Sequence, residues 1–156
     1  MFPFIKPTFK EQKVCPEEPY EYKLRFDGGS RGNPGPSGCG AVIYHNNKEI
    51  WADYLYLGTK FTNNYAEYSG LILGLEQALK MDITNILVEG DSLLVINQLT
   101  NKYKCKSDNL IPLHANAIEL AKQFERIEFQ HILRHKNKRA DELSNKAINN
   151  VDFTVL

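Results

Sequence analysis

The first patterned segment of the chain alternates apolar and polar residues. In YKLRFD, residues 22–27, the apolar Tyr, Leu and Phe alternate with the charged Lys, Arg and Asp, which is typical of a half-buried strand. Two further apolar runs, GCGAVIYHN and EIWADYLYLG, surround Asn46 and Asn47, a pair that favours a tight turn. The pattern therefore predicts three consecutive strands, with the second and third forming an antiparallel hairpin.

The spacing of apolar residues then changes to that of a helix. Between residues 64 and 81 they recur on one helix face: Tyr68, Leu71, Ile72, Leu75 and Leu79. The remaining segments follow in the order strand, helix, helix, strand, helix, over residues 85–91, 92–99, 110–124, 126–133 and 138–149.

The resulting order, βββαβααβα, predicts an α/β fold. Strands joined by helical crossovers lie parallel to a neighbour, so we expect a mixed five-stranded sheet, three antiparallel strands then two parallel ones, flanked by helices. Residues 1–20 are rich in proline and lack either period, which predicts an N-terminal arm. The domain is expected over 21–149 and a C-terminal tail over 150–156.

Composition adds that this is an ordinary soluble domain. The chain has 156 residues, 42% of them hydrophobic and 24% charged, and no apolar run reaches the ~18 residues of a membrane span. Prolines and lysines break up the N-terminus, so secretion is not expected. Three cysteines without CxxC spacing encode neither a disulfide framework nor a zinc site. We expect a reducing, intracellular compartment, the cytoplasm or the nucleus.

The charge balance argues against a general electrostatic attraction to nucleic acid. Nineteen basic and nineteen acidic residues give zero formal charge, so any polyanion must be bound locally. Two basic runs are candidates, NKYKCK at 101–106 and RHKNKR at 134–139. Considered alone, each is more simply a solvated charged face.

Four acidic residues occur where regular elements end or begin. Asp27 ends the first predicted strand and opens the glycine-rich DGGSRGNPGPSG, and Asp91 ends the fourth strand. Glu67 and Asp141 are expected in the first turns of helices. Ordinary explanations exist for each, because Asp favours turns, Asp91 is placed to cap a helix, Asn64 with Glu67 has capping-box spacing, and Asp141 complements a helix dipole.

Glu67 is harder to explain in this way, because it borders the helix face that must contact the sheet. If the first and fourth strands pair in parallel, the backbones of Asp27 and Asp91 lie about 4.8 Å apart. Four carboxylates in one cleft require cations, and magnesium suits an all-oxygen site. Two such ions about 3.5 to 4 Å apart activate a water and stabilise the leaving oxygen of a phosphodiester. The acids therefore predict phosphodiester hydrolysis.

The chain resembles a known family from residue 22 to about 149. It is similar to type 1 ribonuclease H, in its compact form without the basic protrusion. The resemblance rests on four motifs in the family's order: FDGGSRGNPGPSGCGAVI, TNNYAEYSGLILGLE, VEGDSLLVINQL and NKRADELSN. It implies the ribonuclease H-like fold.

The resemblance implies endonucleolytic hydrolysis of the RNA strand of RNA/DNA hybrids, giving 5′-phosphate and 3′-hydroxyl ends. The implied catalytic and metal-holding residues are Asp27, Glu67, Asp91 and Asp141. Two Mg²⁺ ions are implied with substrate bound, with Mn²⁺ as a substitute. The partner is the hybrid, without membrane or small-molecule cofactor, and the protein is expected to be a monomer. The implied substrate-binding residues are Gly28, Ser30, Gly32, Asn33, Thr62, Asn63 and Asn64.

The sequence departs from the family pattern at three places. Leu93 stands where many members have a glutamine that contacts the minor groove. The loop after the last strand is short, so the auxiliary catalytic role falls to either His135 or the basic Arg134. NKYKCK replaces the basic protrusion, which predicts modest affinity with a shallow salt dependence.

Two alternatives remain at this point. One is a catalytically silent protein that binds hybrids, and the other is a nuclease of the same superfold acting on other nucleic acid structures.

Overall fold

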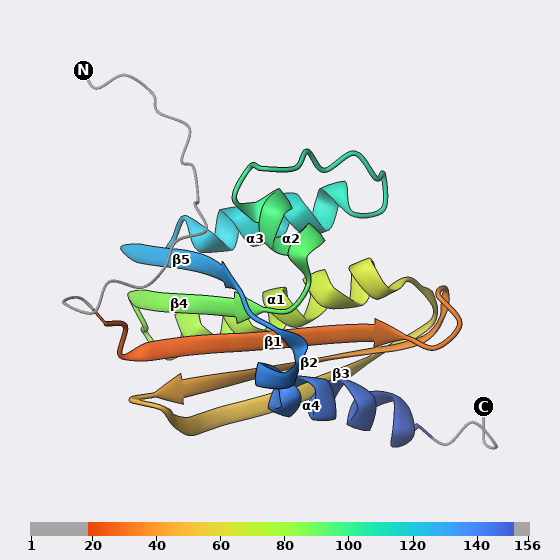
Figure 1. Ribbon diagram of the computed structural model, residues 1–156, viewed down its shortest axis with the longest axis horizontal. Helices are drawn as coiled ribbons and strands as arrows, with labels where there is room; N and C mark the ends of the chain where they lie inside the picture. The colour runs from red at the N-terminus through yellow and green to blue at the C-terminus, as the bar shows by residue number, and fades with distance from the viewer. Residues whose placement is uncertain (1–18, 152–156) are drawn as a thin grey trace.

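The computed structural model describes residues 19–151, which form one five-stranded sheet with helices on both faces (Figure 1). The sheet order is β3-β2-β1-β4-β5. This confirms the predicted α/β fold and the order βββαβααβα, to which a short 3-10 helix, η1, is added. The elements are β1 (Tyr22–Ser30), β2 (Gly35–His45), β3 (Lys48–Phe61), α1 (Asn63–Lys80), β4 (Asn85–Gly90), α2 (Leu93–Leu99), α3 (Ile111–Ala121), β5 (Arg126–His131), η1 (Arg134–Lys136) and α4 (Lys138–Asn149).

The central strand, β1, pairs antiparallel with β2 and parallel with β4. The last parallel pair joins Phe26 to Gly90. Asp27 and Asp91 are the next residues on their two segments, so they lie side by side where this pairing ends. One detail of the prediction is wrong, since Asp27 does not end its strand. β1 continues to Ser30 because β2 keeps pairing with it beyond the end of β4.

The hairpin between β2 and β3 forms where the sequence predicts it. Asn46 and Asn47 both have positive φ, 49° and 68°, as a two-residue type I′ turn requires. His45 and Lys48 close the ladder on either side of the turn.

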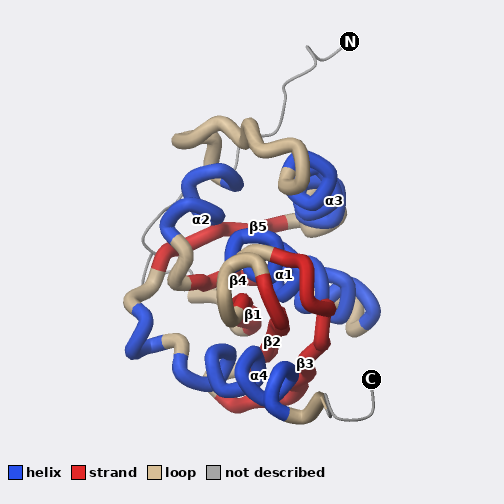
Figure 2. The backbone as a smooth tube through the Cα atoms, turned by 90° about the vertical axis from the view of Figure 1, so that its right-hand side faces the viewer, coloured by secondary structure: helices blue, strands red, loops and turns tan. Residues whose placement is uncertain are grey.

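The helices divide between the two faces of the sheet (Figure 2). α1 packs on β1 and β2 and also contacts α3, while α4 covers β1, β2 and β3 on the opposite face. The main core lies between α1 and the sheet, where β1 contributes Leu24 and Phe26, both fully buried. A smaller cluster joins Val42 of β2 to Ala140 and Leu143 of α4.

Glycines bring α1 unusually close to β1. A Cβ at Gly28 would overlap the backbone of Ala66, and one at Gly70 would lie 2.5 Å from the carbonyl oxygen of Asp27. Real Cβ atoms are not found at such distances, so the two backbones touch at this crossing because both positions lack a side chain. The position of α1 along β1 is therefore fixed at the residues that carry the acids.

The predicted arm and tail lie largely outside the described residues, which exclude 1–18 and 152–156. Tyr20, placed in the arm by the sequence, is 7% exposed, and the Arg126 guanidinium lies 4.0 Å from its ring centroid. The exact boundaries of arm, domain and tail stay predictions. Within residues 19–151 no helix is long and apolar enough to cross a membrane.

Candidate active site

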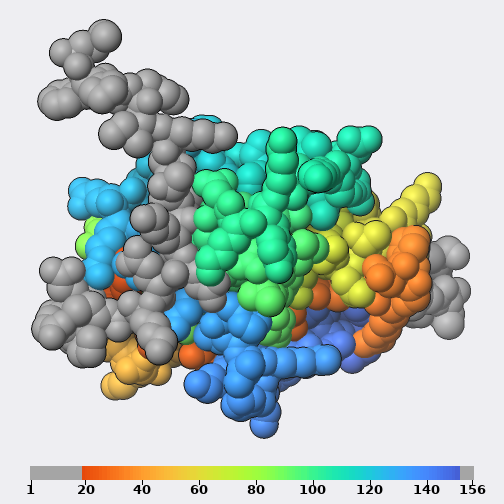
Figure 3. Space-filling model, turned by 45° about the horizontal axis from the view of Figure 1, so that its top comes forward, coloured from red at the N-terminus to blue at the C-terminus, as the bar shows by residue number. Residues whose placement is uncertain are grey.

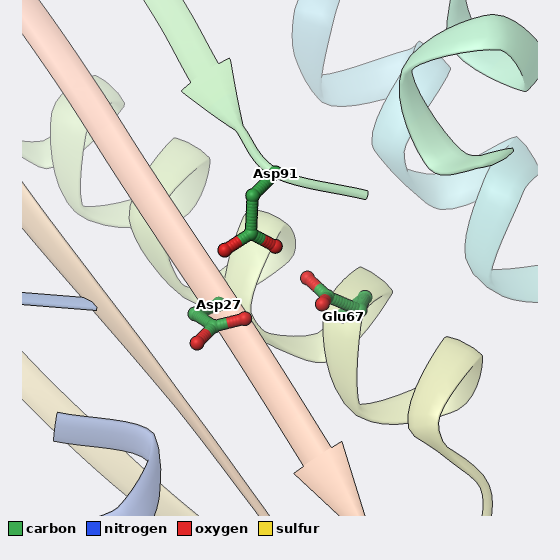
Figure 4. A group of neighbouring side chains, drawn as sticks. All are labelled: Asp27, Glu67 and Asp91. Carbon is green, nitrogen blue, oxygen red and sulfur yellow. The ribbon is translucent and has the colours of Figure 1, made fainter. Parts of the chain in front are cut away.

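Three acidic side chains from three elements converge at the end of β4 (Figure 4). Asp27 projects from β1, Asp91 follows β4, and Glu67 reaches across from α1. One carboxylate oxygen of each lies within 4.8 Å of the others. Parallel pairing of β1 with β4 places the two aspartates side by side, and the contact at Gly28 and Gly70 brings Glu67 to them.

The start of α1 decides which way Glu67 points. Thr62 has an extended backbone, and its hydroxyl accepts a hydrogen bond from Tyr65 N, at 3.3 Å. Thr62 is therefore the N-cap, and the expectation that Asn64 caps this helix is wrong. Because the helix begins at Asn63, Glu67 lies in its second turn rather than its first, on the face that contacts β1.

Asp91 is likewise not a helix cap. The N-cap of α2 is Ser92, whose hydroxyl accepts from Val95 N at 3.3 Å. The Asp91 carboxylate is instead held by Asn137, whose Nδ2 donates to Asp91 Oδ2 at 3.3 Å and to the Phe26 carbonyl at 2.9 Å. Asn137 is 1% exposed.

Sequence reasoning missed Asn137. Its only signal is an asparagine directly before the last helix, and it makes no side-chain cap bond there. Its role arises from contacts with β1 and with the residue after β4, both distant in sequence, and it links the Phe26 carbonyl in the middle of β1 to the Asp91 carboxylate.

Burial and mutual repulsion raise the pKa values of the three acids. Asp27 is 6% exposed and Glu67 8%. Burial, together with the charge of Asp91, raises the pKa of Asp27 to about 7. Burial and the two aspartates raise the pKa of Glu67 well above its usual value. Burial also raises the pKa of Asp91, although Asn137 and Arg134 lower it.

The donor set fits a divalent cation. Glu67 Oε2 is buried and has no hydrogen-bond partner among residues 19–151, so a group that needs a positive partner faces the two aspartates. Clustered carboxylate oxygens of this kind suit Mg²⁺, Mn²⁺ or Ca²⁺. A bound cation would offset the repulsion that raises these pKa values.

The acids lie in a cleft of about 390 Å³, here called the acidic cleft. Asp141, in the first turn of α4, lies on its wall. Arg134 also lines the cleft, whereas the exposed His135 is not among its lining residues. His131 Nε2 lies 3.2 Å from the Asp91 carbonyl oxygen. The lining residues are Asp27, Gly28, Gly29, Ser30, Arg31, Asn63, Glu67, Asp91, Arg134, Asp141, Ser144, Asn145 and Ile148.

A second groove, of about 420 Å³, lies beyond the start of α1 and is here called the lysine groove. It is lined by Lys104 and Lys106 from the loop before α3, and by Asn33, Thr62 and Asn64. The expected substrate-binding residues thus divide in two. Gly28, Ser30 and Asn63 line the acidic cleft, Asn33, Thr62 and Asn64 line the lysine groove, and Gly32 lines neither.

The turn after β1 and the start of α1 separate the two depressions, and we call residues 30–33 with 62–64 the ridge. Hydrogen bonds join its two halves: Ser30 N donates to Asn63 Oδ1 at 2.7 Å, and Asn63 N donates to Asn33 Oδ1 at 2.9 Å. Ser30 Oγ also donates to the Phe61 carbonyl at 2.8 Å. Figure 3 shows the turn after β1 (orange) on one side of the molecule's visible face, with the segment after β4 (green) and the segment around η1 (blue) on the other side.

Comparison with known proteins gives consistent matches over most of the chain. The family model described as reverse transcriptase-like matches residues 25–147. Ribonuclease HI of Halobacterium salinarum is 37% identical over 142 residues, covering 91% of this chain and 71% of that protein. A bifunctional protein of Mycobacterium tuberculosis is 43% identical over 126 residues, 80% of this chain, but the chain spans only 35% of that relative's length.

Solved structures match equally well. The crystal structure of the Halobacterium salinarum RNase H1 superposes with a TM-score of 0.80 at 36% identity, covering 83% of this chain and 98% of that one. An RNase H1 solved in complex with an RNA/DNA hybrid superposes with a TM-score of 0.76 at 37% identity, covering 82% of this chain and 96% of that one.

Proposed function

The chain belongs to the type 1 ribonuclease H family, and from that premise we propose that it hydrolyses the RNA strand of RNA/DNA hybrids. The observation that carries the proposal is the convergence of Asp27, Glu67 and Asp91, with carboxylate oxygens within 4.8 Å of one another, in a cleft shaped by the rigid ridge. A relative in this family was solved in complex with an RNA/DNA hybrid.

The four acids have distinct positions in the proposed reaction. Asp27, Glu67 and Asp91 would hold divalent cations in the cleft, and Asp141 would add a carboxylate from the α4 wall. Two Mg²⁺ ions, or Mn²⁺ in their place, supply water activation and stabilisation of the leaving oxygen when bound. Hydrolysis joins a water oxygen to phosphorus and breaks the P–O3′ bond, so the products carry a 5′-phosphate and a 3′-hydroxyl.

The basic residues bind and orient the strand rather than the metal. Arg134 lines the cleft near Asp91 and lowers the pKa of that carboxyl, which suits a contact with the phosphate being cleaved or with the released product. We assign the auxiliary role to Arg134 in preference to His135, because only Arg134 is among the cleft-lining residues.

The ridge between two depressions supports a two-stranded substrate. With the RNA strand in the acidic cleft, the DNA strand runs over the lysine groove, and the ridge enters the minor groove. Ser30, Asn63 and the backbone at Gly28 then face the RNA 2′-hydroxyls, which distinguish RNA from DNA. Asn33, Thr62 and Asn64 face the DNA strand, and Gly32 contributes backbone at the turn.

A cleavage assay tests this proposal. The protein is incubated with a hybrid whose RNA strand is labelled, and with the same RNA in double-stranded RNA and the same sequence as duplex DNA, each with Mg²⁺ or Mn²⁺. We expect cleavage of the hybrid RNA alone, and its loss in Asp27→Asn with hybrid binding retained.

Two results would contradict the proposal. An intact RNA strand at high protein concentration, with the wild type behaving like Asp27→Asn, would favour a catalytically silent hybrid-binding protein. Cleavage of duplex DNA would favour another nuclease activity of this superfold.

The proposed setting is a monomer in an intracellular, reducing compartment. The two cysteines among the described residues, Cys39 and Cys105, are free thiols, which agrees with such a compartment.

A further inference from the structure

Three of the five arginines in the chain are committed to partners within the fold. Arg25 pairs with Glu89 at 3.2 Å, Arg139 pairs with Glu49 at 2.7 Å, and Arg126 lies over the Tyr20 ring. Arg31 and Arg134 have no ion pair within 4.0 Å among residues 19–151, and both line the acidic cleft. The arginines left without a carboxylate are therefore the two that border the cleft with the most acids.

Arg31 is presented on a rigid support. Its backbone N–H donates to the Pro36 carbonyl at 2.9 Å, which closes the turn between β1 and β2. The preceding residue, Ser30, is bound to α1 through Asn63 and to the end of β3 through Phe61. A guanidinium held on such a turn loses less conformational entropy when it binds a ligand than one on a mobile loop.

Arg31 is not among the main causes of the pKa shifts of Asp27, Glu67 and Asp91. It lies four residues beyond Asp27 along β1 and its turn, roughly 13 Å at the rise of a strand. Arg134, by contrast, lies in η1 and is among the charges that shift the pKa of Asp91. The two arginines therefore border the cleft at different distances from its acids.

A nucleic acid strand running through the cleft places phosphates on both sides of the one being cleaved. An exposed, unpaired guanidinium at the cleft border is suited to one of them, because its planar fork binds two phosphate oxygens at once. We propose that Arg31 binds a phosphate of the RNA strand that flanks the scissile phosphate. This inference rests on the proposed hybrid substrate and assigns a contact in the same cleft.

The first test measures binding without cleavage, in an Asp27→Asn background with labelled hybrid and Mg²⁺. Adding Arg31→Ala is expected to weaken binding about 5- to 10-fold and to reduce the slope of log K against log salt by about 1. Arg31→Lys is expected to restore the slope but only part of the affinity, because it keeps the charge and loses the fork.

Lys122→Ala is the matched control for loss of one positive charge. Lys122 pairs with Glu119 at 3.0 Å and lies outside both the acidic cleft and the lysine groove, so its removal should change neither affinity nor slope. An Arg31→Ala slope equal to that of the Lys122→Ala protein would overturn the assignment.

The second test locates the phosphate. Hybrids are prepared with one neutral methylphosphonate linkage at successive positions of the RNA strand. At one flanking position the neutral linkage should weaken hybrid binding by the protein that keeps Arg31. The same linkage should have little further effect on binding by Arg31→Ala. Additive losses at every RNA position, or coupling found only with linkages in the DNA strand, would contradict the proposal.

Hybrid cleavage and the Arg31 contact can be tested independently. If the wild type does not cleave hybrids, the proposed function fails. If it cleaves them while Arg31→Ala shows no change in salt slope and no coupling to any linkage, only the Arg31 contact fails.

Discussion

Asp27 shows how one buried acid makes the metal-free protein sensitive to pH. Its pKa is raised to about 7, whereas in the unfolded chain it is about 3.9. A carboxyl with a raised folded-state pKa contributes stability that is fully present below the unfolded pKa and is lost as pH rises through the folded pKa. Stability without metal should therefore fall between about pH 4 and pH 8.

Asp27→Asn should separate stability from activity. Because the amide cannot ionise, we expect the metal-free variant to exceed the wild type in unfolding free energy at pH 8 by about 1 to 3 kcal/mol, and the difference to vanish near pH 4. Cleavage should be lost. Denaturant unfolding in a chelator at pH 4, 6 and 8 measures this, and a variant less stable than wild type at pH 8 would contradict it.

Metal affinity should depend on the same proton. Because Asp27 must lose its proton to bind a cation, the Mn²⁺ association constant is expected to rise about tenfold per pH unit below pH 7. Glu67 must also lose a proton to bind a cation, and its pKa is raised as well, so the rise should be at least this steep. Calorimetric titration at pH 6, 7, 8 and 8.5 and constant ionic strength checks this, and equal affinities at pH 6 and 8 would rule it out.

Asn137 should contribute more to the site than its position before α4 suggests. Asn137→Ala removes the donor shared by the Phe26 carbonyl and Asp91, and the buried carbonyl then lacks a partner. We expect a loss of about 1 to 3 kcal/mol in stability. The cleavage rate should also fall at saturating substrate with little change in KM, because Asp91 is no longer held.

Asn137→Asp provides the comparison, since it keeps the shape but sets a carboxylate against Asp91. It should impair cleavage more than the alanine variant does. Steady-state kinetics on both proteins decide the point, and a pure KM effect would contradict a positioning role.

At the scale of elements, the contact between α1 and β1 sets the distance from Glu67 to the aspartates. Gly70→Ala would place a methyl group 2.5 Å from the Asp27 carbonyl oxygen and force the helix outward. We expect a loss of about 1 to 3 kcal/mol together with weaker Mn²⁺ binding, measured by unfolding and calorimetry.

Gly29→Ala is the matched control for this prediction. Its Cβ would meet only Ser144 Oγ at 3.9 Å and Asn63 Oδ1 at 4.0 Å, an ordinary contact distance, so its stability should stay near that of the wild type. Equal losses from both alanines would show that glycine content, rather than the helix–strand contact, is what matters.

The sequence predicted elements better than it predicted their joints. Periodicity located all five strands and four helices, because each buries a repeating apolar face. It failed at Thr62, because a cap depends on which hydroxyl reaches a backbone N–H, and several candidates stood nearby. It also failed at Asn137, whose partners lie on strands distant in sequence.

The sequence predicted that Asp27 and Asp91 lie together because parallel pairing of their strands brings the residues after Phe26 and Gly90 side by side. The sequence did not predict that Gly28 lets the backbone of α1 contact β1. A run of glycines looks like a loose turn until the helix that packs against it is known. The unpaired state of Arg31 could not be inferred either, because it depends on which carboxylates lie within reach in three dimensions.

At the scale of the whole molecule, the two depressions should be separable by mutation. Replacing both Lys104 and Lys106 by alanine should weaken hybrid binding at low salt and reduce the salt slope by up to about 2, while Mn²⁺ affinity stays unchanged. Fluorescence anisotropy with labelled hybrid and calorimetry with Mn²⁺ measure the two quantities. A loss of metal affinity in this double variant would show that the lysine groove and acidic cleft are not independent.

The bonded ridge also bears on which duplexes the protein accepts. Hydrogen bonds between Ser30, Asn33 and Asn63 hold the two halves of the ridge together, so its width is fixed. A double helix fits when the width of its minor groove matches the width of the ridge, whatever its base sequence. The protein should therefore select duplexes by the shape of the double helix rather than by base sequence. Hybrids of unrelated sequence should be cut at similar rates.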